Sequence, residues 1–501
     1  MLKLTPHSRL GRFLALVTAA TVALPPSMPL AASPAMEKLF YILKQKGSIT
    51  SDEYDLLIAT MKAEDAAEKK AAAPAAAAST GGLEKRLAQT EEQLSNLSSN
   101  LFQTKSQVEE ISKISDNTSP STMSKTDLDA LLSDKWYERI KLKGYMQFRG
   151  AGVLRESGGD LNVPNDAIAS DGQTFGIRRG RLTMSGDVTD HLYLYAQVDY
   201  FASITGTNVL QARDYYTDIS LDPAREFRVR IGLSKVPYGW SNLQSSQNRL
   251  ALERPDALNS AVEGERDIGA FFYWAPVHIR NRFKDLVKMG LRGSGDYGVF
   301  AFGAYNGQGI NRTDANGQPH WVARLAYPFE LSNGQFIEFG INGYTGKFVP
   351  TTTTGAGAPT FGRGGVKDQR VGVSAIIYPQ PFGLEAEWNW GQGPQLDTAS
   401  NTIIAQSLQG GYLQACYRHV FADQSELIPF VRWQTYNGGR KFATNAPRNQ
   451  VDEVGLGVRY IPYPELELSL MYNRGTRTNT AVAPFPDVKY DYIGMQAQIN
   501  F

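Results

Sequence analysis

The chain has 501 residues, with 51 Lys and Arg against 50 Asp and Glu, and Cys416 is its one cysteine. Because the positive and negative charges are nearly equal in number, nucleic-acid binding has no general electrostatic support. A single cysteine excludes an intrachain disulfide and a cysteine-rich metal site. Beyond the N-terminus no stretch approaches the roughly eighteen uninterrupted apolar residues of a membrane helix, so helical membrane spans are not expected.

The N-terminus has the layout of a secretory signal peptide. Lys3, Arg9 and Arg12 form a basic start, an apolar run covers 13–24, and small residues follow up to Ala32. We expect residues 1–32 to be a cleaved signal that takes no part in the fold. The mature chain is then slightly acidic, and it is exported.

A helical period follows the signal. Two short apolar faces predict a helical hairpin over 33–64, an Ala-rich linker covers 65–82, and a second linker covers 116–139. Between the linkers, apolar positions recur at alternating spacings of four and three, which predicts a coiled coil over 83–115. A single amphipathic helix fits the same spacing. A coiled coil would make the protein an oligomer, but such polar heptads do not define the number of chains.

From residue 140 to 501 the period changes to two. In the first segment Leu142, Met146 and Phe148 alternate with polar residues, and the last residues up to Phe501 alternate in the same way. Apolar-outside, polar-inside alternation in an exported chain is typical of a transmembrane β-barrel. A soluble sandwich also alternates, but it would not explain the signal peptide and the C-terminal phenylalanine together.

Connection lengths predict the number of strands. Seven short connections alternate with eight long ones between 140 and 501. This rhythm predicts an all-β, 16-stranded antiparallel barrel with both ends at the periplasmic side. Residues 276–286 interrupt the rhythm, either as a bulged excursion or as part of a further hairpin, so eighteen strands is the alternative.

The stretch 226–269 carries the main evidence for a pore. Phe227, Val229 and Ile231 alternate with Arg228 and Arg230, which indicates a strand with one apolar and one basic face. Proline then breaks the strand, and about thirty mixed polar residues follow before strand-like sequence resumes. This pattern predicts a pore wall and a long loop that narrows the pore.

Several motifs, in their order along the chain, resemble the O/P family of outer-membrane porins, which is known for phosphate-selective members. They are Lys141-Leu142-Lys143-Gly144-Tyr145, Arg178-Arg179-Gly180-Arg181-Leu182, Val198-Asp199-Tyr200, Arg230-Ile231-Gly232, Lys235-Val236-Pro237-Tyr238-Gly239, Glu253-Arg254, Arg266-Asp267-Ile268-Gly269 and Tyr305-Asn306-Gly307. The resemblance is good over 140–330. It implies a trimeric sixteen-stranded barrel with loop 235–265 folded inward, and an N-terminal extension like that of some relatives.

Selection in a pore depends on the charges at its narrowest section. Alternation places a set of basic residues on the lumen face, as candidates for anion binding: Lys141, Lys143, Arg149, Arg179, Arg181, Arg228 and Arg230. The loop supplies the candidates for the constriction: Lys235, Arg249, Glu253, Arg254 and Arg266. Arginine offers a planar fork to phosphate or carboxylate. Alternatively, carboxylates such as Asp199, Asp214 and Asp218 only neutralise these arginines.

The expected function is passive diffusion of small hydrophilic solutes through the outer membrane, with preference for anions such as phosphate. A weakly selective general porin, or one for organic acids or sugars, is the alternative, and an envelope tether with a plugged barrel is a remote one. The expected partners are outer-membrane lipid, the solutes and two further copies of the chain. No cofactor, metal or enzymatic activity is expected, because no histidine lies in a recognisable catalytic spacing.

Overall fold

The computed structural model describes residues 136–163, 166, 168, 175–202, 207–481 and 483–501. The expected signal peptide, helical hairpin, Ala-rich linker and coiled coil lie outside these residues, as does most of the linker over 116–139. The last four residues of that linker form the 3₁₀-helix η1 (Trp136–Arg139). Within the described ranges every helix is too short or too polar to cross a bilayer.

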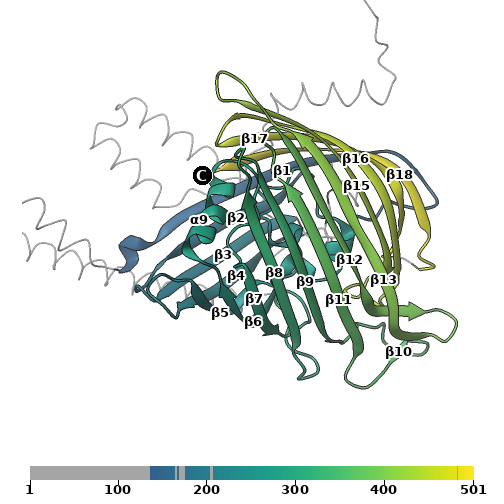
Figure 1. Cartoon of the computed structure of the whole chain (residues 1–501). Coiled ribbons are helices and arrows are strands. Elements are labelled where there is room, and N and C mark those ends of the chain that lie inside the picture. Colours follow the sequence, from purple (N-terminus) through teal and green to yellow (C-terminus); the bar gives the residue numbers. More distant parts are fainter. Residues whose placement is uncertain (1–135, 164–165, 167, 169–174, 203–206, 482) are drawn as a thin grey trace, which may run out of the picture. The chain divides into compact units, whose positions relative to one another are not determined.

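The described chain forms one closed antiparallel barrel, because β1 pairs with both β2 and β18 (Figure 1). Its long strands are β1 (Lys141–Ser157), β2 (Gly176–Asp187), β3 (Leu192–Ala202), β4 (Asn208–Ser220), β5 (Phe227–Lys235), β6 (Arg266–Trp274), β7 (Phe300–Tyr305), β8 (His320–Glu330), β9 (Phe336–Phe348), β11 (Val366–Ile377), β12 (Phe382–Asp397), β13 (Thr402–Tyr417), β15 (Glu426–Gly439), β16 (Arg448–Tyr463), β17 (Leu466–Thr478) and β18 (Asp487–Asn500).

The prediction of sixteen strands is confirmed, and the alternative of eighteen is wrong. Two further extended segments, β10 (Thr360–Phe361) and β14 (His419–Val420), have two residues each. β10 pairs with the beginning of β13, and β14 pairs with β15 just after β13 ends. With two residues each, both only extend the pairing of β13 and β15, and neither crosses the hydrocarbon layer, which is about 30 Å thick.

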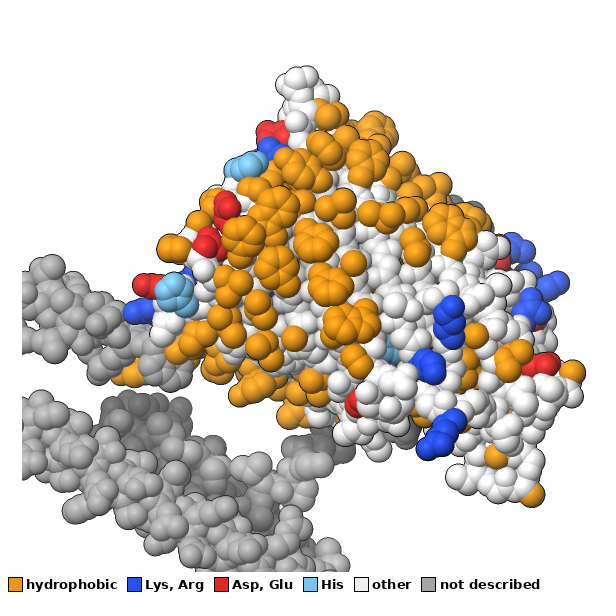
Figure 2. Space-filling view, turned by 60° about the horizontal axis from the view of Figure 1, so that its bottom comes forward, with side chains coloured by type: hydrophobic (Ala, Val, Ile, Leu, Met, Phe, Trp, Pro, Cys, Tyr) orange, Lys and Arg blue, Asp and Glu red, His pale blue; other side chains and the backbone are white. Residues whose placement is uncertain are grey.

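Alternation along the strands produces a lipid-facing wall and a polar interior. In β1, Leu142 and Phe148 are exposed, whereas Tyr145, Gln147 and Arg149 are buried. Since successive side chains of a strand point to opposite faces, the apolar set gathers on the outside. Figure 2 shows hydrophobic side chains spread over a broad part of one face of the wall.

The interruption at residues 276–286 is a helix, so both expectations for it, a bulge or a hairpin, are wrong. α9 (Val277–Lys288) lies in the connection between β6 and β7, which is longer than the short turn expected at 293–296. Pro276 precedes the helix, and Ile279, Phe283 and Leu286 are its buried residues. Their spacing of four and three is the period of one helix face.

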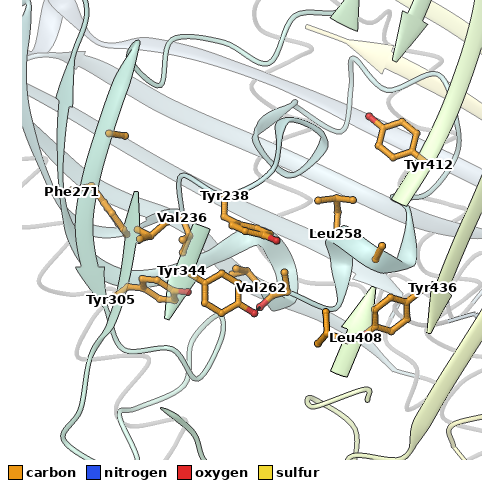
Figure 3. Packing of buried hydrophobic residues seen from close by; sticks show 14 of the residues in the cluster. Val236, Tyr238, Leu258, Val262, Phe271, Tyr305, Tyr344, Leu408, Tyr412 and Tyr436 are labelled. Atoms are coloured by element: carbon orange, nitrogen blue, oxygen red, sulfur yellow. Dashed lines mark hydrogen bonds between the residues drawn. The ribbon is translucent and has the colours of Figure 1, made fainter. Parts of the chain in front are cut away.

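The largest apolar cluster among the described residues lies inside the barrel, where the connection between β5 and β6 folds inward. We call residues 236–265 the inner loop; it contains α7 (Trp240–Leu243), α8 (Asp256–Asn259) and the 3₁₀-helix η2 (Glu263–Glu265). Val236, Tyr238, Leu258 and Val262 of the loop pack against wall residues such as Tyr344. Figure 3 shows this packing on both sides of the loop.

The barrel closes at a contact between the two ends of the sheet. Gly144 N donates to Phe501 O at 2.7 Å, and Phe501 N donates to Gly144 O at 3.0 Å. A Cβ at Gly144 would lie 2.4 Å from Arg181 O and 2.6 Å from Cζ of the Phe501 ring. The terminal ring therefore lies over a position that has no room for a side chain.

We predict that Gly144→Val destabilises the barrel by about 1–3 kcal/mol, because an overpacked position forces the backbone or a ring to shift. The measurement is guanidinium unfolding in detergent, where the midpoint should fall. Gly152→Val is the matched control, because its Cβ would meet nothing nearer than Ile493 Cγ2 at 4.0 Å. Equal losses in both variants would contradict the role of this contact.

Candidate pore constriction

The inner loop turns into the barrel directly after β5. Pro237 cannot donate to the ladder, and Gly239 has a φ of 77°, which favours glycine. A Cβ at Gly239 would lie 2.8 Å from Leu258 Cδ1, so the turn and α8 pack closely. Tyr238 meets the ring of Tyr344 edge-on, with centroids 5.0 Å apart. The turn is thus held against the wall at β9.

Strands β11 and β12 bind the inner loop on one side of the barrel. Arg370 in β11 donates to the hydroxyl and the carbonyl oxygen of Ser260 at 2.8 and 3.0 Å. Glu387 in β12 accepts the backbone N–H groups of Trp240 and Ser241 at 2.6 and 2.7 Å. These N–H groups begin α7 and have no partner within the helix. The carboxylate therefore anchors the start of the loop.

Other strands bind the loop from further around the barrel. Arg459 in β16 donates to Leu250 O at 3.3 Å, and Arg477 in β17 forms an ion pair with Asp256 at 3.1 Å. Lys235, the last residue of β5, donates to two loop carbonyl oxygens at 2.8 and 3.0 Å. The loop is therefore tied to several parts of the wall and crosses the interior.

Glu253 connects the inner loop to the basic side of the barrel. Its carboxylate binds Arg149 at 2.7 Å, Arg178 at 2.7 Å and Arg179 at 3.2 Å. Burial raises the pKa of Glu253, but the attraction of these arginines outweighs it and holds the pKa well below its usual range. The carboxylate thus stays ionised, and it binds three guanidinium groups at once.

A polar pocket of about 290 Å³ lies between the inner loop and the wall formed by β2 to β4. Among the described residues, six arginines and three carboxylates line it, so its formal charge is +3. The arginines are Arg178, Arg179, Arg181, Arg213, Arg254 and Arg312, and the carboxylates are Asp199, Glu253 and Glu263. We call this cavity the arginine pocket.

One loop arginine near the arginine pocket has an unsatisfied guanidinium group. Within the described residues, Nε and both Nη atoms of Arg249 lack a hydrogen-bond partner, whereas Arg254 forms an ion pair with Glu265 through Nη1. Burial and then the repulsion of Arg179 hold the pKa of Arg249 well below its usual range. Burial and then Arg249 do the same to the pKa of Arg254. Buried cations without partners are costly, and an anion would relieve that cost.

The structure brings part of the predicted residues together. Arg179, Arg181, Glu253 and Arg254 line the arginine pocket, and Arg149 binds Glu253. Arg249 is also a predicted residue, and its charge interacts with those of Arg179 and Glu253.

Other predicted residues lie elsewhere. Lys141 and Lys143 are exposed at the beginning of β1. Arg230 is bound to Asp218 at 2.7 Å, and Arg228 to Asp296 at 2.9 Å. Near the pocket, but not on its lining, Lys235 holds loop carbonyls and Arg266 binds Asp214 at 2.8 Å. For these arginines the structure has the carboxylate partners that the alternative anticipated.

Sequence reasoning missed three arginines of the pocket. Arg178 and Arg213 are the residues that the strand register skips, next to the pairs Gln147–Arg179 and Gln197–Asp214 respectively. A β-bulge there turns two successive side chains inward. Strict alternation would have placed both arginines in lipid, at a cost of about 2–4 kcal/mol each, and that cost was the signal for a bulge. Arg312 lies in the β7–β8 connection, outside any strand pattern.

The described residues include no group of three or more His, Cys, Asp or Glu side chains placed to hold a metal ion. What the pocket offers is fixed guanidinium groups around a small polar space. Such groups bind planar or tetrahedral oxyanions through charge-assisted hydrogen bonds.

Several solved structures are similar to this chain. Similar solved structures include the outer membrane channel DcaP of Acinetobacter baumannii, with 14% identity over 72% of this chain and 97% of that chain and a TM-score of 0.42. They also include OmpF of Salmonella typhi in complex with daunomycin (13%, 72% and 97%, 0.44) and OprB of Pseudomonas putida (9%, 75% and 96%, 0.43). No curated protein sequence matches the chain.

The family profile described as phosphate-selective porin O and P matches residues 154–501. That match covers most of the chain and the greater part of the barrel described above. The protein therefore belongs to the phosphate-selective porin O and P family and is an outer-membrane porin.

Proposed function

We propose that this porin prefers anions and that the arginine pocket is its selectivity site. The observation that carries the proposal is the excess of arginines over carboxylates in the pocket, together with the unpartnered guanidinium of Arg249. The arginines of the pocket also have carboxylate partners, but they share them, as Arg178 and Arg179 share Glu253. The positive potential is therefore concentrated where the inner loop meets the wall.

Passage through such a site needs binding that is favourable but not tight. Arginine side chains replace part of the hydration shell of an entering phosphate or carboxylate by charge-assisted hydrogen bonds. Glu253 and Asp199 limit the net charge, so that the anion can leave again. The preferred solutes are small oxyanions, with inorganic phosphate as the first to test.

We extend the proposal to the parts outside the described residues. The extension over 33–139 lies in the periplasm, because both ends of a bacterial barrel face that side. The functional unit is a homotrimer, as the resemblance implies, with outer-membrane lipid around it. Cross-linking of the full chain in detergent should yield three times the monomer mass.

One observation favours the remote alternative of a tether with a plugged barrel. Besides the inner loop, the segment after α9 enters the interior: Leu291 packs against Trp240 and Tyr378, and Arg292 binds Glu467 in β17 at 3.1 Å. Two inserted segments would suit a plug. A conductance measurement separates the two functions, because a plugged barrel carries no current.

We predict that the wild-type channel in planar bilayers gives a reversal potential on the anion side in a KCl gradient and that phosphate blocks its chloride current. Arg249→Gln and Arg254→Gln should each weaken the phosphate block about tenfold, since a hydrogen bond to a charged group contributes about 1.5 kcal/mol or more. Arg282→Gln is the control; this residue of α9 pairs with Glu330 at the periplasmic side. If the wild type and all variants have an anion-to-cation permeability ratio near one, the result would instead support the weakly selective porin.

Removing a negative charge from the arginine pocket should increase the anion preference. Glu253→Gln removes a charge that neutralises Arg149, Arg178 and Arg179 while it keeps the shape and two polar atoms of the side chain. We predict a higher anion-to-cation permeability ratio and a tighter phosphate block than in the wild type, measured in the same bilayers. If Glu253→Gln and Arg254→Gln shift the ratio in the same direction, the change in the inner loop is steric and the electrostatic mechanism fails.

A further inference from the structure

Two lysines face each other on the outer wall of the barrel. Lys347 near the end of β9 and Lys367 near the beginning of β11 are direct cross-strand partners. Both are exposed, whereas their neighbours Phe348 and Asp368 are buried and point inward. Direct partners in a sheet have Cβ atoms about 5 Å apart, so two ammonium groups in this position repel each other.

The described residues offer these lysines no compensating carboxylate. Neither Lys347 nor Lys367 has an ion pair within the described chain. The carboxylates Glu263, Glu330 and Asp368 pair with Arg312, Arg282 and Lys441 instead. Arg363 adds a third exposed positive charge at the same edge. Asn316 connects the segment around Arg363 to the end of β9, because its Nδ2 donates to both Lys347 O at 2.8 Å and Gly364 O at 3.1 Å. We call Lys347, Lys367 and Arg363 the outer basic cluster.

An apolar hollow continues the same two strands toward the middle of the membrane. It has a volume of about 440 Å³, and its lining includes Thr345 and Gln369, the next outward residues after the two lysines. Ala323, Gly343 and Gly391 in its lining leave space because they have small side chains or none, and the lining residues Trp321, Val371 and Trp390 are exposed. The cluster and the hollow therefore form one continuous surface.

The orientation of the barrel places this surface in the outer leaflet. Lys347 and Lys367 flank the long connection between β9 and β11, and long connections of bacterial barrels are extracellular. The hollow then lies at the level of acyl chains, and the cluster lies at the level of headgroups. A ligand that fits both parts has acyl chains and at least one phosphate group near them.

We propose that the outer basic cluster and the hollow form a binding site for a phosphorylated, acylated glycolipid of the outer leaflet. Its phosphate lies between Lys347 and Lys367 and removes their repulsion, and an acyl chain fills the hollow between Trp321 and Trp390. Free phosphate would gain only the exposed charges, whereas the lipid also buries apolar surface. The site is distinct from the arginine pocket and does not depend on anion preference in the lumen.

A second group of cations at the outer face serves as the matched control. Arg155 in β1 and Arg474 in β17 are highly exposed, but they share the carboxylate of Asp491 at 3.7 and 3.6 Å. Their charge is thus partly compensated by the protein itself. Replacing them changes the total charge as much as replacing the two lysines does.

The test uses native mass spectrometry of the full-length protein in detergent, titrated with diphosphorylated lipid A. The wild type should retain the lipid, and Lys347→Gln/Lys367→Gln should weaken its binding about tenfold or more, because each lysine near a lipid phosphate contributes independently. Arg155→Gln/Arg474→Gln should change the affinity less than threefold. Ala323→Phe, which fills the hollow without a change of charge, should also weaken binding.

Two comparisons define the ligand. Dephosphorylated lipid A should bind at least tenfold more weakly than the diphosphorylated form, and inorganic phosphate should not displace the bound lipid. Equal effects of the lysine and arginine pairs, or equal binding of both lipid forms, would overturn the proposal. Displacement by inorganic phosphate would also overturn it and would indicate a simple anion site. Conductance and phosphate block should be unchanged in all these variants, so failure here is distinguishable from failure of the anion preference.

Discussion

Every backbone N–H and C=O at membrane depth must be paired within the protein, and this constraint determines the architecture. A sheet meets it only if the first and last strands join, which β1 and β18 do over twelve residue pairs from Tyr145 to Ser157. The contact of Gly144 with Phe501 completes the ring of strands at its periplasmic end. Side chains of the wall then have only two environments, lipid outside and the enclosed interior.

The interior has a different requirement, because buried cations need partners. Most arginines inside the barrel find a carboxylate on a neighbouring strand, as Arg181 does with Asp199 at 2.9 Å. The inner loop satisfies others by presenting Glu253 and its own carbonyl oxygens. The arrangement is thus mostly balanced. Within the described residues the guanidinium group of Arg249 stays without a partner, and it lies beside the pocket where we propose that an anionic solute binds.

Sequence periodicity was sufficient for the barrel and insufficient for the site. A period of two and the alternation of connection lengths predicted sixteen strands. This works because the alternation of apolar and polar residues within a single strand already shows which side faces lipid and which faces the interior. The helix α9 was misread since its twelve residues lie between strands, where a short run of period four and three is easily overlooked. Which strand binds Ser260 or Glu253 depends on contacts between distant segments, and no local pattern contains that information.

The two bulges explain why the arginines concentrate where they do. A regular strand turns one side chain in two toward the interior, so neighbouring inward residues lie about 7 Å apart along it. At Arg178 and Arg213 the shift of register turns a pair of successive residues inward. These bulges lie in β2 and β4, beside Arg181 and opposite the inner loop. Local irregularities of the sheet therefore raise the density of positive charge above the limit of a regular barrel, and they do so where the loop narrows the interior.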